Sequence, residues 1–462
     1  MTTKNLFVLA GAAASLSSVA LADQPAVSRD EVRAIVSEML SDAETRSSLL
    51  QGGGTAGYDK NFFIASSDNN FRINFSGYSQ WRYTMSFRDD GAGNAPTGVA
   101  GNDNNLETGF TNHRTYLQFD GHVINPDFKY VINGEFSDNN TGGDFNLRDA
   151  FFSYNLGSGW WIKGGQFRLG FLKEENIFDT YQMAAERSVT NFVFTQGRSQ
   201  GVELGYRADE WRFVGAFSDG LQSANTDFAT AAGGPNYAER AYAFTARGDW
   251  AFAGKLENFD QFTSKQDDEF AGYIGAALHI EDTSNTNDNA AAPLQQRDNR
   301  YSAYTIDAML KGSGFSLFGA FIGANTDFQP GTVAPDNFDD YGVVLQGAWR
   351  FVKETEAFIR YDATFYDGDR NFENDRQDFL TFGVNHYFAG QAARLTVDAI
   401  LSLQPTELGA TAPAPVGGVG VNPTIAGSPT SFGGSAIGTA QGLLPSRDDT
   451  SIALRVQFQF MF

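Results

Sequence analysis

The side chains that could support catalysis are few and scattered in this chain of 462 residues. The chain has no cysteine, which excludes thiol catalysis and zinc sites built from cysteine. The four histidines lie far apart, and none neighbours a serine or a paired aspartate in a motif typical of nucleophilic catalysis. They are His113, His122, His279 and His386. The sequence therefore predicts that the chain is not an enzyme.

One acidic stretch has the oxygen spacing of a calcium loop, with Asp367, Asp369 and Asn371 at alternate positions. Phe372 stands where such a loop needs a glycine, and the closing position holds Asp378 instead of glutamate. We interpret the stretch as a solvated acidic loop and expect no resident metal or cofactor. The formal net charge of -22 also argues against a nucleic-acid partner, which would require a basic face.

The chemistry that this chain can support is the electrostatic selection of ions by charges along a water-filled passage. Segment 169–198 is the best candidate for the narrowest point, because it mixes charged residues with apolar ones that would let it pack. The charged residues are Lys173, Glu174, Glu175, Asp179, Glu186, Arg187 and Arg198. The apolar residues are Phe171, Leu172, Ile177, Phe178, Tyr181 and Met183. We expect this loop to fold inward as a constriction; the alternative is an exposed loop or a latch between subunits.

The elements that would position such a passage are β-strands. From Phe71 to Phe462, apolar and polar residues alternate in about sixteen segments, most of roughly 9 to 14 residues, which suits strands that cross a bilayer at a tilt. The segments are 71–87, 112–124, 128–137, 144–156, 160–168, 199–207, 211–219, 240–252, 269–281, 299–311, 314–324, 339–351, 353–366, 376–388, 392–404 and 450–462. Closure into a barrel would satisfy every backbone donor and acceptor. The sequence predicts an all-β fold, a transmembrane antiparallel β-barrel of about 16 strands.

The connections between these segments alternate in length. The predicted periplasmic turns are tight, as at Gly312-Ser313, and the opposite connections are long, up to the Gly/Pro-rich loop 405–449. One turn, 253–268, is too long for this pattern, and we expect it to extend into the periplasm. Five tryptophans lie at predicted periplasmic strand ends, where an interfacial aromatic girdle belongs. They are Trp160, Trp161, Trp211, Trp250 and Trp349.

The N-terminal residues indicate export. Residues 1–22 have the order of a secretory signal peptide, with Lys4, an apolar core and a cleavage site after Ala22. Residues 23–57 follow as a periplasmic amphipathic helix, which begins near Ser28 and ends at a glycine linker. This helix could form a short coiled coil that helps to trimerise the chain, or it could plug or rest on a barrel mouth. The barrel domain would then span residues 58–462.

Several stretches resemble the phosphate-selective porin O and P family. Residues 60–83, which read KNFFIASSDNNFRINFSGYSQWRY, look like the first strand of that family, and residues 147–154, LRDAFFSY, are similar to its fourth strand. Residues 162–168, IKGGQFR, together with Glu174-Glu175 and Glu186-Arg187-Ser188, resemble the next strand and the long loop after it. The helix and glycine linker resemble those of members from Planctomycetes-like bacteria.

The resemblance implies an outer-membrane barrel of about sixteen strands, commonly trimeric, that passes small anions or other solutes. The terminal Phe462, with Phe460 and Phe458, looks like the signal that the barrel-assembly machinery recognises. The expected partners are therefore outer-membrane lipid, that machinery, further copies of the chain in a homotrimer, and small solutes or ions. The alternative function is a structural or adhesive outer-membrane barrel with acidic extracellular loops.

Side chains that alternate with the lipid-facing ones should line the lumen. The residues expected at the pore wall or the constriction are Arg82, Arg114, Lys129, Glu135, Arg168, Lys173, Glu186, Arg187, Arg198 and Arg360. Many of these charges could instead form cross-strand pairs that keep the lumen polar.

The balance of these charges bears on selectivity. Inward bases alternate with inward acids, and loss of Lys4 with the signal peptide leaves 55 acids against 32 bases, a mature charge of -23. We therefore predict weak selectivity, general for small solutes or mildly favouring cations at low salt, without a tight phosphate site.

Overall fold

The computed structural model describes residues 37–38, 54–88, 105–136, 145–225, 242–283, 299–328, 337–370, 372, 374–406, 441–444, 446 and 450–462. The chain divides into two units, residues 1–54 and 55–462. The predicted signal peptide and nearly all of the predicted N-terminal helix lie outside the described residues. Within the described ranges, no helix is long and apolar enough to cross a membrane.

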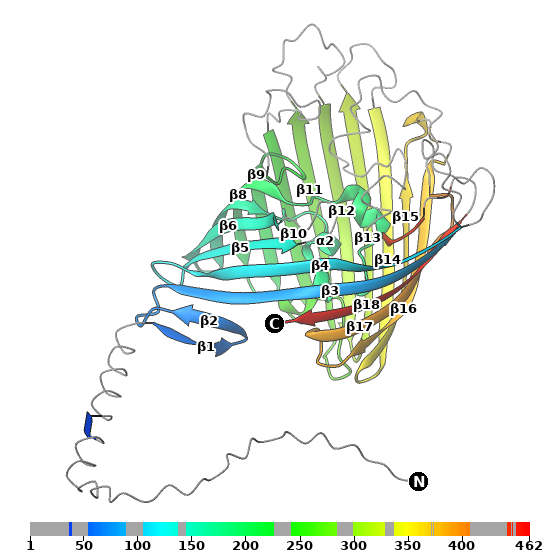
Figure 1. The fold of residues 1–462 in the computed structure, drawn as a ribbon. Helices are drawn as coiled ribbons and strands as arrows, with labels where there is room; N and C mark the ends of the chain where they lie inside the picture. The colour runs from blue at the N-terminus through cyan, green and yellow to red at the C-terminus, as the bar shows by residue number, and fades with distance from the viewer. Residues whose placement is uncertain are drawn as a thin grey trace, which may run out of the picture. The chain divides into compact units, whose positions relative to one another are not determined.

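Sixteen strands, β3 to β18, form a closed ring of antiparallel neighbours (Figure 1). The ring closes where β18 pairs with β3, from Ser451 opposite Arg88 to Met461 opposite Tyr78. The first eight strands are β3 (Arg72–Arg88), β4 (Leu106–His122), β5 (Phe128–Phe136), β6 (Phe145–Gly157), β7 (Trp160–Phe167), β8 (Ser199–Arg207), β9 (Trp211–Ser218) and β10 (Tyr242–Ala253). The others are β11 (Ala271–Thr283), β12 (Asn299–Gly312), β13 (Phe315–Phe328), β14 (Asn337–Val352), β15 (Thr355–Phe365), β16 (Arg376–Tyr387), β17 (Ala393–Ser402) and β18 (Ser451–Met461). The predicted antiparallel barrel of sixteen strands is confirmed.

The described helices are short and lie in the connections between strands. They are α2 (Lys173–Asn176), η1 (Asp179–Tyr181), α3 (Val189–Phe194), η2 (Leu256–Phe259) and η3 (Gly368–Arg370). Figure 1 shows that β3 to β8 are strongly inclined, whereas β10 to β15 run steeply. The tilt of the strands therefore differs between the two sides of the wall.

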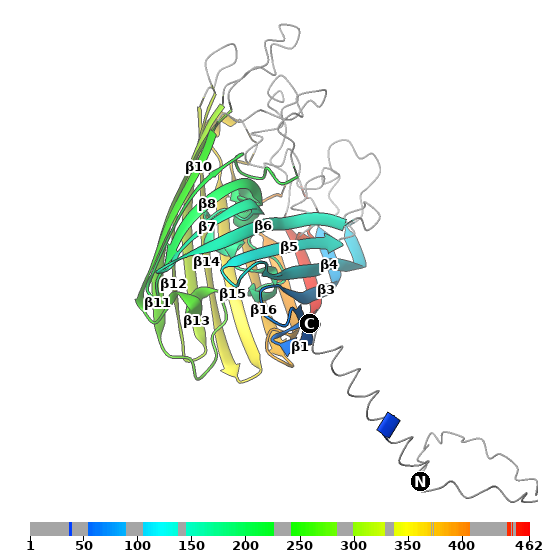
Figure 2. The same ribbon diagram turned by 90° about the vertical axis from the view of Figure 1, so that its left-hand side faces the viewer.

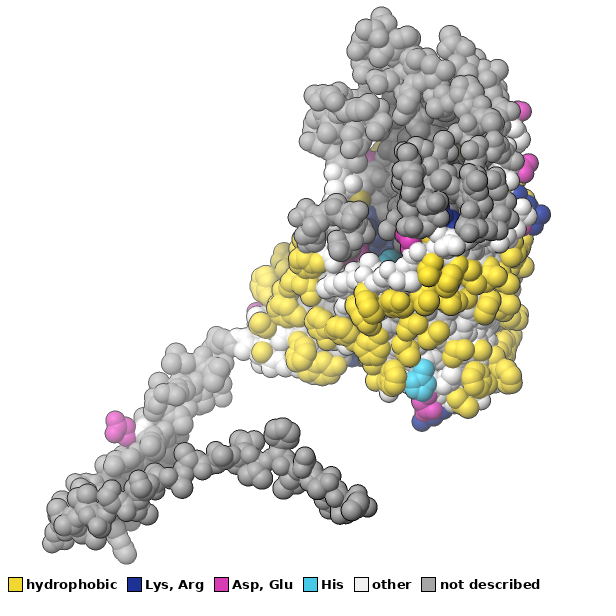
Figure 3. All heavy atoms as spheres, turned by 45° about the vertical axis from the view of Figure 1, so that its right-hand side comes forward, with side chains coloured by type: hydrophobic (Ala, Val, Ile, Leu, Met, Phe, Trp, Pro, Cys, Tyr) yellow, Lys and Arg dark blue, Asp and Glu magenta, His cyan; other side chains and the backbone are white. Residues whose placement is uncertain are grey.

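Side chains alternate between two environments along each strand. In β18, Arg455 is 0% exposed, whereas Leu454 and Phe460 are 41% and 46% exposed. The exposed apolar side chains cover the outside of the wall as a belt (Figure 3). Trp161, which the girdle pattern assigns to the outside, instead points inward and places its Nε1 3.4 Å from the carboxylate of Glu203. A polar interior and an apolar exterior are typical of a barrel that faces lipid.

A short hairpin, β1 (Thr55–Asp59) and β2 (Asn61–Ala65), precedes the barrel and has no counterpart among the predicted strands. β2 pairs with the first residues of β3, with Phe62 opposite Phe75, and further along β3 the partner is β18. The hairpin turns at Lys60, which has a φ of 62°. Two strands of five residues carry too few alternations to be separated from the linker that flanks them.

The turn between β10 and β11, residues 254–270, folds back into the barrel. Phe259 and Phe262 are 0% exposed, and their ring centres lie 4.7 Å and 5.1 Å from those of Tyr273 and Phe318 on the wall. The expected extension into the periplasm is therefore wrong. The physical reason is the apolar side of the turn, which is buried against the inner wall instead of remaining in water.

Candidate functional site

The segment between β7 and β8, residues 168–198, lies inside the barrel (Figures 1 and 2), and we call it the lumen loop. Most of its residues are buried. Its Phe171 and Val189 are 0% exposed and belong to one apolar cluster with Tyr301 and Phe379 of the wall. The apolar side chains that predict inward folding help to hold the loop, because four of the six, Phe171, Leu172, Ile177 and Met183, are buried.

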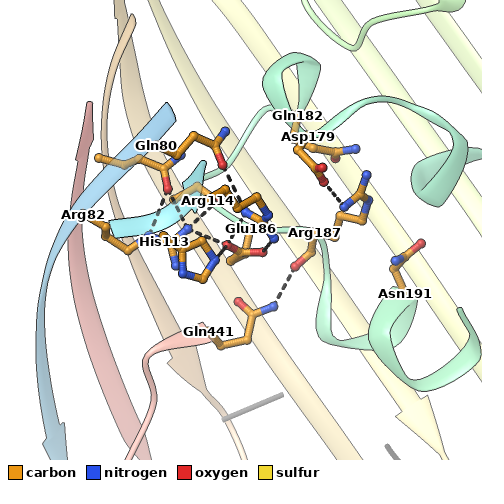
Figure 4. Close-up of polar contacts among 12 residues, drawn as sticks. Gln80, Arg82, His113, Arg114, Asp179, Gln182, Glu186, Arg187, Asn191 and Gln441 are labelled. Atoms are coloured by element: carbon orange, nitrogen blue, oxygen red, sulfur yellow. Dashed lines mark hydrogen bonds and ion pairs between the residues drawn. The ribbon is translucent and has the colours of Figure 1, made fainter. Parts of the chain in front are cut away.

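The carboxylate of Glu186 is the main polar contact between the lumen loop and strands β3 and β4 (Figure 4). Its Oε1 lies 2.5 Å from both Arg82 and His113, and Arg114 binds both oxygens at 2.8 Å. Burial works to raise the pKa of Glu186, but its basic neighbours, Arg114 first, outweigh burial and hold that pKa well below its usual value. Glu186 is therefore held as an anion between the two strands.

Two consecutive residues of β4, His113 and Arg114, both face the lumen because of a β-bulge. Gln80 of β3 lies opposite Arg114, and the next residue, Trp81, lies opposite Asn112, so that His113 has no partner in the register. In a regular strand adjacent residues face opposite sides, and an extra residue re-aims the side chain. No glycine marks this bulge in the sequence. The sequence does carry one sign of the bulge, which is the adjacent pair His113 and Arg114. In a strand that alternates strictly, one of these two polar side chains would face lipid.

A second group of charges holds the lumen loop together internally. Arg187 contacts the carboxylate of Asp179 and lies 3.3 Å from Glu175. Arg168 lies 3.4 Å from Glu175 and 3.6 Å from Oδ2 of Asp179, and the same oxygen accepts a 3.0 Å hydrogen bond from Tyr78 of β3. Burial works to raise the pKa of Asp179, but Arg187 and then Arg114 outweigh it, and the pKa is held well below its usual value.

Strand β15 also holds the lumen loop, close to its helix α3. Arg360 of β15 donates to the carbonyl oxygen of Glu186 at 2.8 Å and lies 3.7 Å from the carboxylate of Glu174. Glu174 in turn accepts hydrogen bonds from the backbone and hydroxyl of Ser188 at 2.7 Å and 2.6 Å. Ser188 also caps α3 by accepting a 2.9 Å bond from the backbone of Asn191. The lumen loop is thus bonded both to β3–β4 and to β15, which β16 to β18 separate in the ring.

A model of the family described as phosphate-selective porin O and P matches residues 89–407, more than half of the chain. The chain belongs to this family. The porin is therefore an outer-membrane β-barrel channel for small solutes. Its family and fold point to a channel rather than to an enzyme.

Solved structures show the same fold. The barrel is similar to an anion-selective porin from Comamonas acidovorans, with a TM-score of 0.54, 9% identity, and coverage of 84% of this chain and 99% of that one. It is also similar to the outer membrane channel DcaP of Acinetobacter baumannii, with a TM-score of 0.50, 12% identity, and coverage of 84% and 97%. At such identities the likeness concerns the fold alone. The chain matches no curated protein.

Six arginines at the lumen loop of the porin pair with six carboxylates. Each of six arginines has a carboxylate within 4.0 Å, and six carboxylates take part in these pairs, so their formal sum is zero. The arginines are Arg82, Arg114, Arg168, Arg187, Arg198 and Arg360. The carboxylates are those of Asp149, Glu174, Glu175, Asp179, Glu186 and Asp362. The six arginines are all residues that the sequence assigns to the pore wall or constriction.

The other expected pore residues take no part in these pairs. Lys129 is exposed on the inner side of β5, opposite His122 of β4. Glu135, also on β5, pairs with Arg148 of β6. Lys173 lies in α2 of the lumen loop, buried, with its ammonium 5.1 Å from the ring centre of Tyr273.

Gln441 is a contact residue that sequence reasoning misses. Its side-chain amide donates to the carbonyl oxygen of Arg187 at 2.7 Å (Figure 4). Its side-chain oxygen accepts a 2.9 Å bond from Arg455. Nearby, the backbone of Leu444 donates to the hydroxyl of Ser86 at 2.8 Å. The described end of loop 405–449 therefore reaches into the barrel, while residues 407–440 lie outside the described residues. No local pattern in the Gly/Pro-rich sequence indicates this contact.

Proposed function

We propose that the porin is a weakly selective channel for small ions and hydrophilic solutes, with the lumen loop as its constriction. The observation that carries the proposal is the pairing of six arginines at the loop, each expected at the pore wall or constriction, with carboxylates. An arginine whose charge is neutralised by a bonded carboxylate attracts a passing anion weakly, because the two fields largely cancel. This pairing supports general permeation over a tight phosphate site.

The experiment is single-channel recording of the purified porin in a planar bilayer, followed by reversal potentials across a potassium chloride gradient. We expect open steps with a small reversal potential, and currents that low phosphate does not block. A strong anion preference with phosphate block would contradict weak selectivity. A protein without conductance would contradict the channel itself. Arg187→Ala tests whether any phosphate block arises at the constriction. If this change relieves the block, a phosphate site lies at the constriction.

The porin is further proposed to act as a homotrimer in contact through β3 and β4. Three polar residues lie together on the outward face of these strands, amid apolar neighbours. The hydroxyl of Ser79 lies 3.3 Å from the amide oxygen of Asn112 and 3.4 Å from the hydroxyl of Thr115, which donates to the same amide at 3.0 Å. Exposed polar groups are costly against hydrocarbon and are common in contacts between membrane segments, so a neighbouring subunit would favour this patch.

We also propose how the chain is exported and assembled into the outer membrane. Cleavage after Ala22 would release a mature chain whose residues 23–57 serve as a periplasmic helix and linker before the barrel domain, residues 58–462. The barrel-assembly machinery would recognise the C-terminal strand that ends in Phe462, and outer-membrane lipid would cover the apolar belt. Support for the role of Phe462 comes from its backbone, which exchanges two 3.0 Å hydrogen bonds with Gly77 at the seam of the barrel.

A further inference from the structure

The turn 254–270 is bonded to several parts of the barrel wall at the end that carries the short turns, which we call the periplasmic end. Lys311 of β12 donates to two carbonyl oxygens of the turn at 2.7 Å and 2.9 Å. Gln266 of the turn donates to the carbonyl oxygen of Arg350 at the end of β14 at 3.1 Å. Gln391, between β16 and β17, donates to the hydroxyl of Thr263 at 3.1 Å. The turn therefore reaches from β10 across to the connection between β16 and β17.

Residues 177–184 of the lumen loop extend this cover. The backbone of Phe262 in the turn donates to the carbonyl oxygen of Tyr181 at 3.4 Å, so that turn and loop are in contact. On the far side of the loop, Arg394 of β17 donates to the carbonyl oxygen of Gln182 at 2.8 Å. Turn and loop together form a continuous layer against the inner face of this part of the wall.

At the periplasmic end, the inner face of the barrel is covered along β11 to β18 and open along β3 to β7. Near the periplasmic end of β11 to β18, most inward side chains are at most 8% exposed. Examples are Tyr273, Ser316, Arg350, Glu356, Arg394 and Gln459. At the same end of β3 to β7, inward side chains remain partly or fully exposed. They include Asn74, Gln118, Lys129, Phe151, Ser153 and Lys163.

We propose that the periplasmic exit of the channel is confined to the sector formed by β3 to β7, and that turn 254–270 is a fixed floor that seals the exit under β11 to β18. The proposal rests on the proposed function as a channel. At the periplasmic end, solvent reaches inner side chains of β3 to β7, whereas those of β11 to β18 are largely covered. A hydrated solute can pass only where solvent has access. The floor is held by backbone carbonyls and by buried rings, so it does not depend on the charge of the solute.

The test uses single cysteines, because the chain has none of its own. Ser153→Cys lies in the open sector on β6, and Ser316→Cys, the matched control, lies in the sealed sector on β13, where Ser316 is 1% exposed. Each variant is folded, placed in a planar bilayer, and treated from the periplasmic side with a positively charged methanethiosulfonate. The thiolate displaces methanesulfinate and keeps the charged group as a mixed disulfide. The labelled fraction is measured by mass spectrometry in parallel with the current.

We expect rapid labelling and a changed current at Ser153→Cys, and at least a tenfold slower reaction at Ser316→Cys. Adding Phe262→Ala, which removes a ring from the floor beside Phe318, should speed labelling of Ser316→Cys. Equal labelling of the two sectors, or faster labelling at Ser316→Cys, would overturn the proposal. If only Ser153→Cys is labelled and the protein has no conductance, the result would still support an open sector at β3 to β7. It would instead contradict the proposed function as a channel.

Discussion

A carboxylate oxygen of Glu186 lies 2.5 Å from Nε2 of His113, a residue without a partner in the register of β4. The bulge at His113 turns two basic neighbours, His113 and Arg114, toward one carboxylate of the lumen loop. It leaves Asn112 on the outer face of the same strand. One irregularity of the wall therefore serves the constriction inside and a polar patch outside.

Glu186→Gln should loosen the lumen loop. The change removes the negative charge that Arg82 and Arg114 share. Both guanidinium groups then face a neutral amide in place of the carboxylate. Breaking one partner of a buried ion pair costs about 3 to 5 kcal/mol. We expect a lower temperature of heat unfolding in detergent and larger current fluctuations in single-channel records. Glu107→Gln is the control, because Glu107 lies exposed on β4, the strand that carries Arg114. Unchanged heat stability and unchanged current noise in Glu186→Gln would contradict an anchoring role.

The strands could be predicted from the sequence because their signal is local. Alternation extends over whole segments, and segment 199–207 coincides with β8. The lumen loop is also indicated locally, by apolar residues in a charged connection. The bulge at His113 is different, because a register shift depends on the neighbouring strand, and its only local sign is the adjacent pair His113 and Arg114. The inward turn 254–270 and the contact of Gln441 with Arg187 depend on segments that are far apart in sequence. The periodicity of one sequence does not show which distant segments are in contact.

Gln441→Ala should widen the distribution of open-state currents without unfolding the barrel. Gln441 links the carbonyl oxygen of Arg187 to Arg455 of β18, so its loss frees one side of the lumen loop. The matched control is Gln377→Ala, since Gln377 is equally buried and bonds Thr406 at the other end of the same long connection, at 2.8 Å. The measurement is single-channel conductance at fixed salt. If both variants behave alike, the contact with Arg187 has no separate role.

Lys173 should make the selectivity of the channel depend on pH. Burial, followed by the nearby Arg212, lowers the pKa of Lys173 to about 8, from an ordinary value of 10.5. Because the unfolded chain holds this proton up to a higher pH, the group adds stability as pH rises from about 8 to its ordinary pKa. Over the same range the lumen loop loses one positive charge, so cations should pass more readily at pH 9 than at pH 7.

Reversal potentials at pH 7 and pH 9 measure this shift in selectivity. Lys173→Gln should behave at both values as the unchanged porin does at pH 9, because it has no charge to lose. Lys173→Arg should behave at both values as the unchanged porin does at pH 7, because arginine stays protonated. A shift of equal size in all three proteins would assign the titration to another group.

Asn112→Leu distinguishes a lipid-facing patch from a subunit contact by the sign of its effect. On a surface that faces lipid, replacing an exposed amide by leucine removes a desolvation cost and should leave stability unchanged or raised. In a contact between subunits, the same change removes the acceptor that Ser79 and Thr115 share, so the trimer should dissociate at a lower temperature. We expect the second result, measured as the temperature at which the trimer converts to monomer in detergent. Val202→Leu on β8, which enlarges an outward apolar residue that is 50% exposed, is the control and should leave that temperature unchanged. A trimer that dissociates at the same or a higher temperature with Asn112→Leu would place the polar patch against lipid and move the subunit contact to another part of the wall.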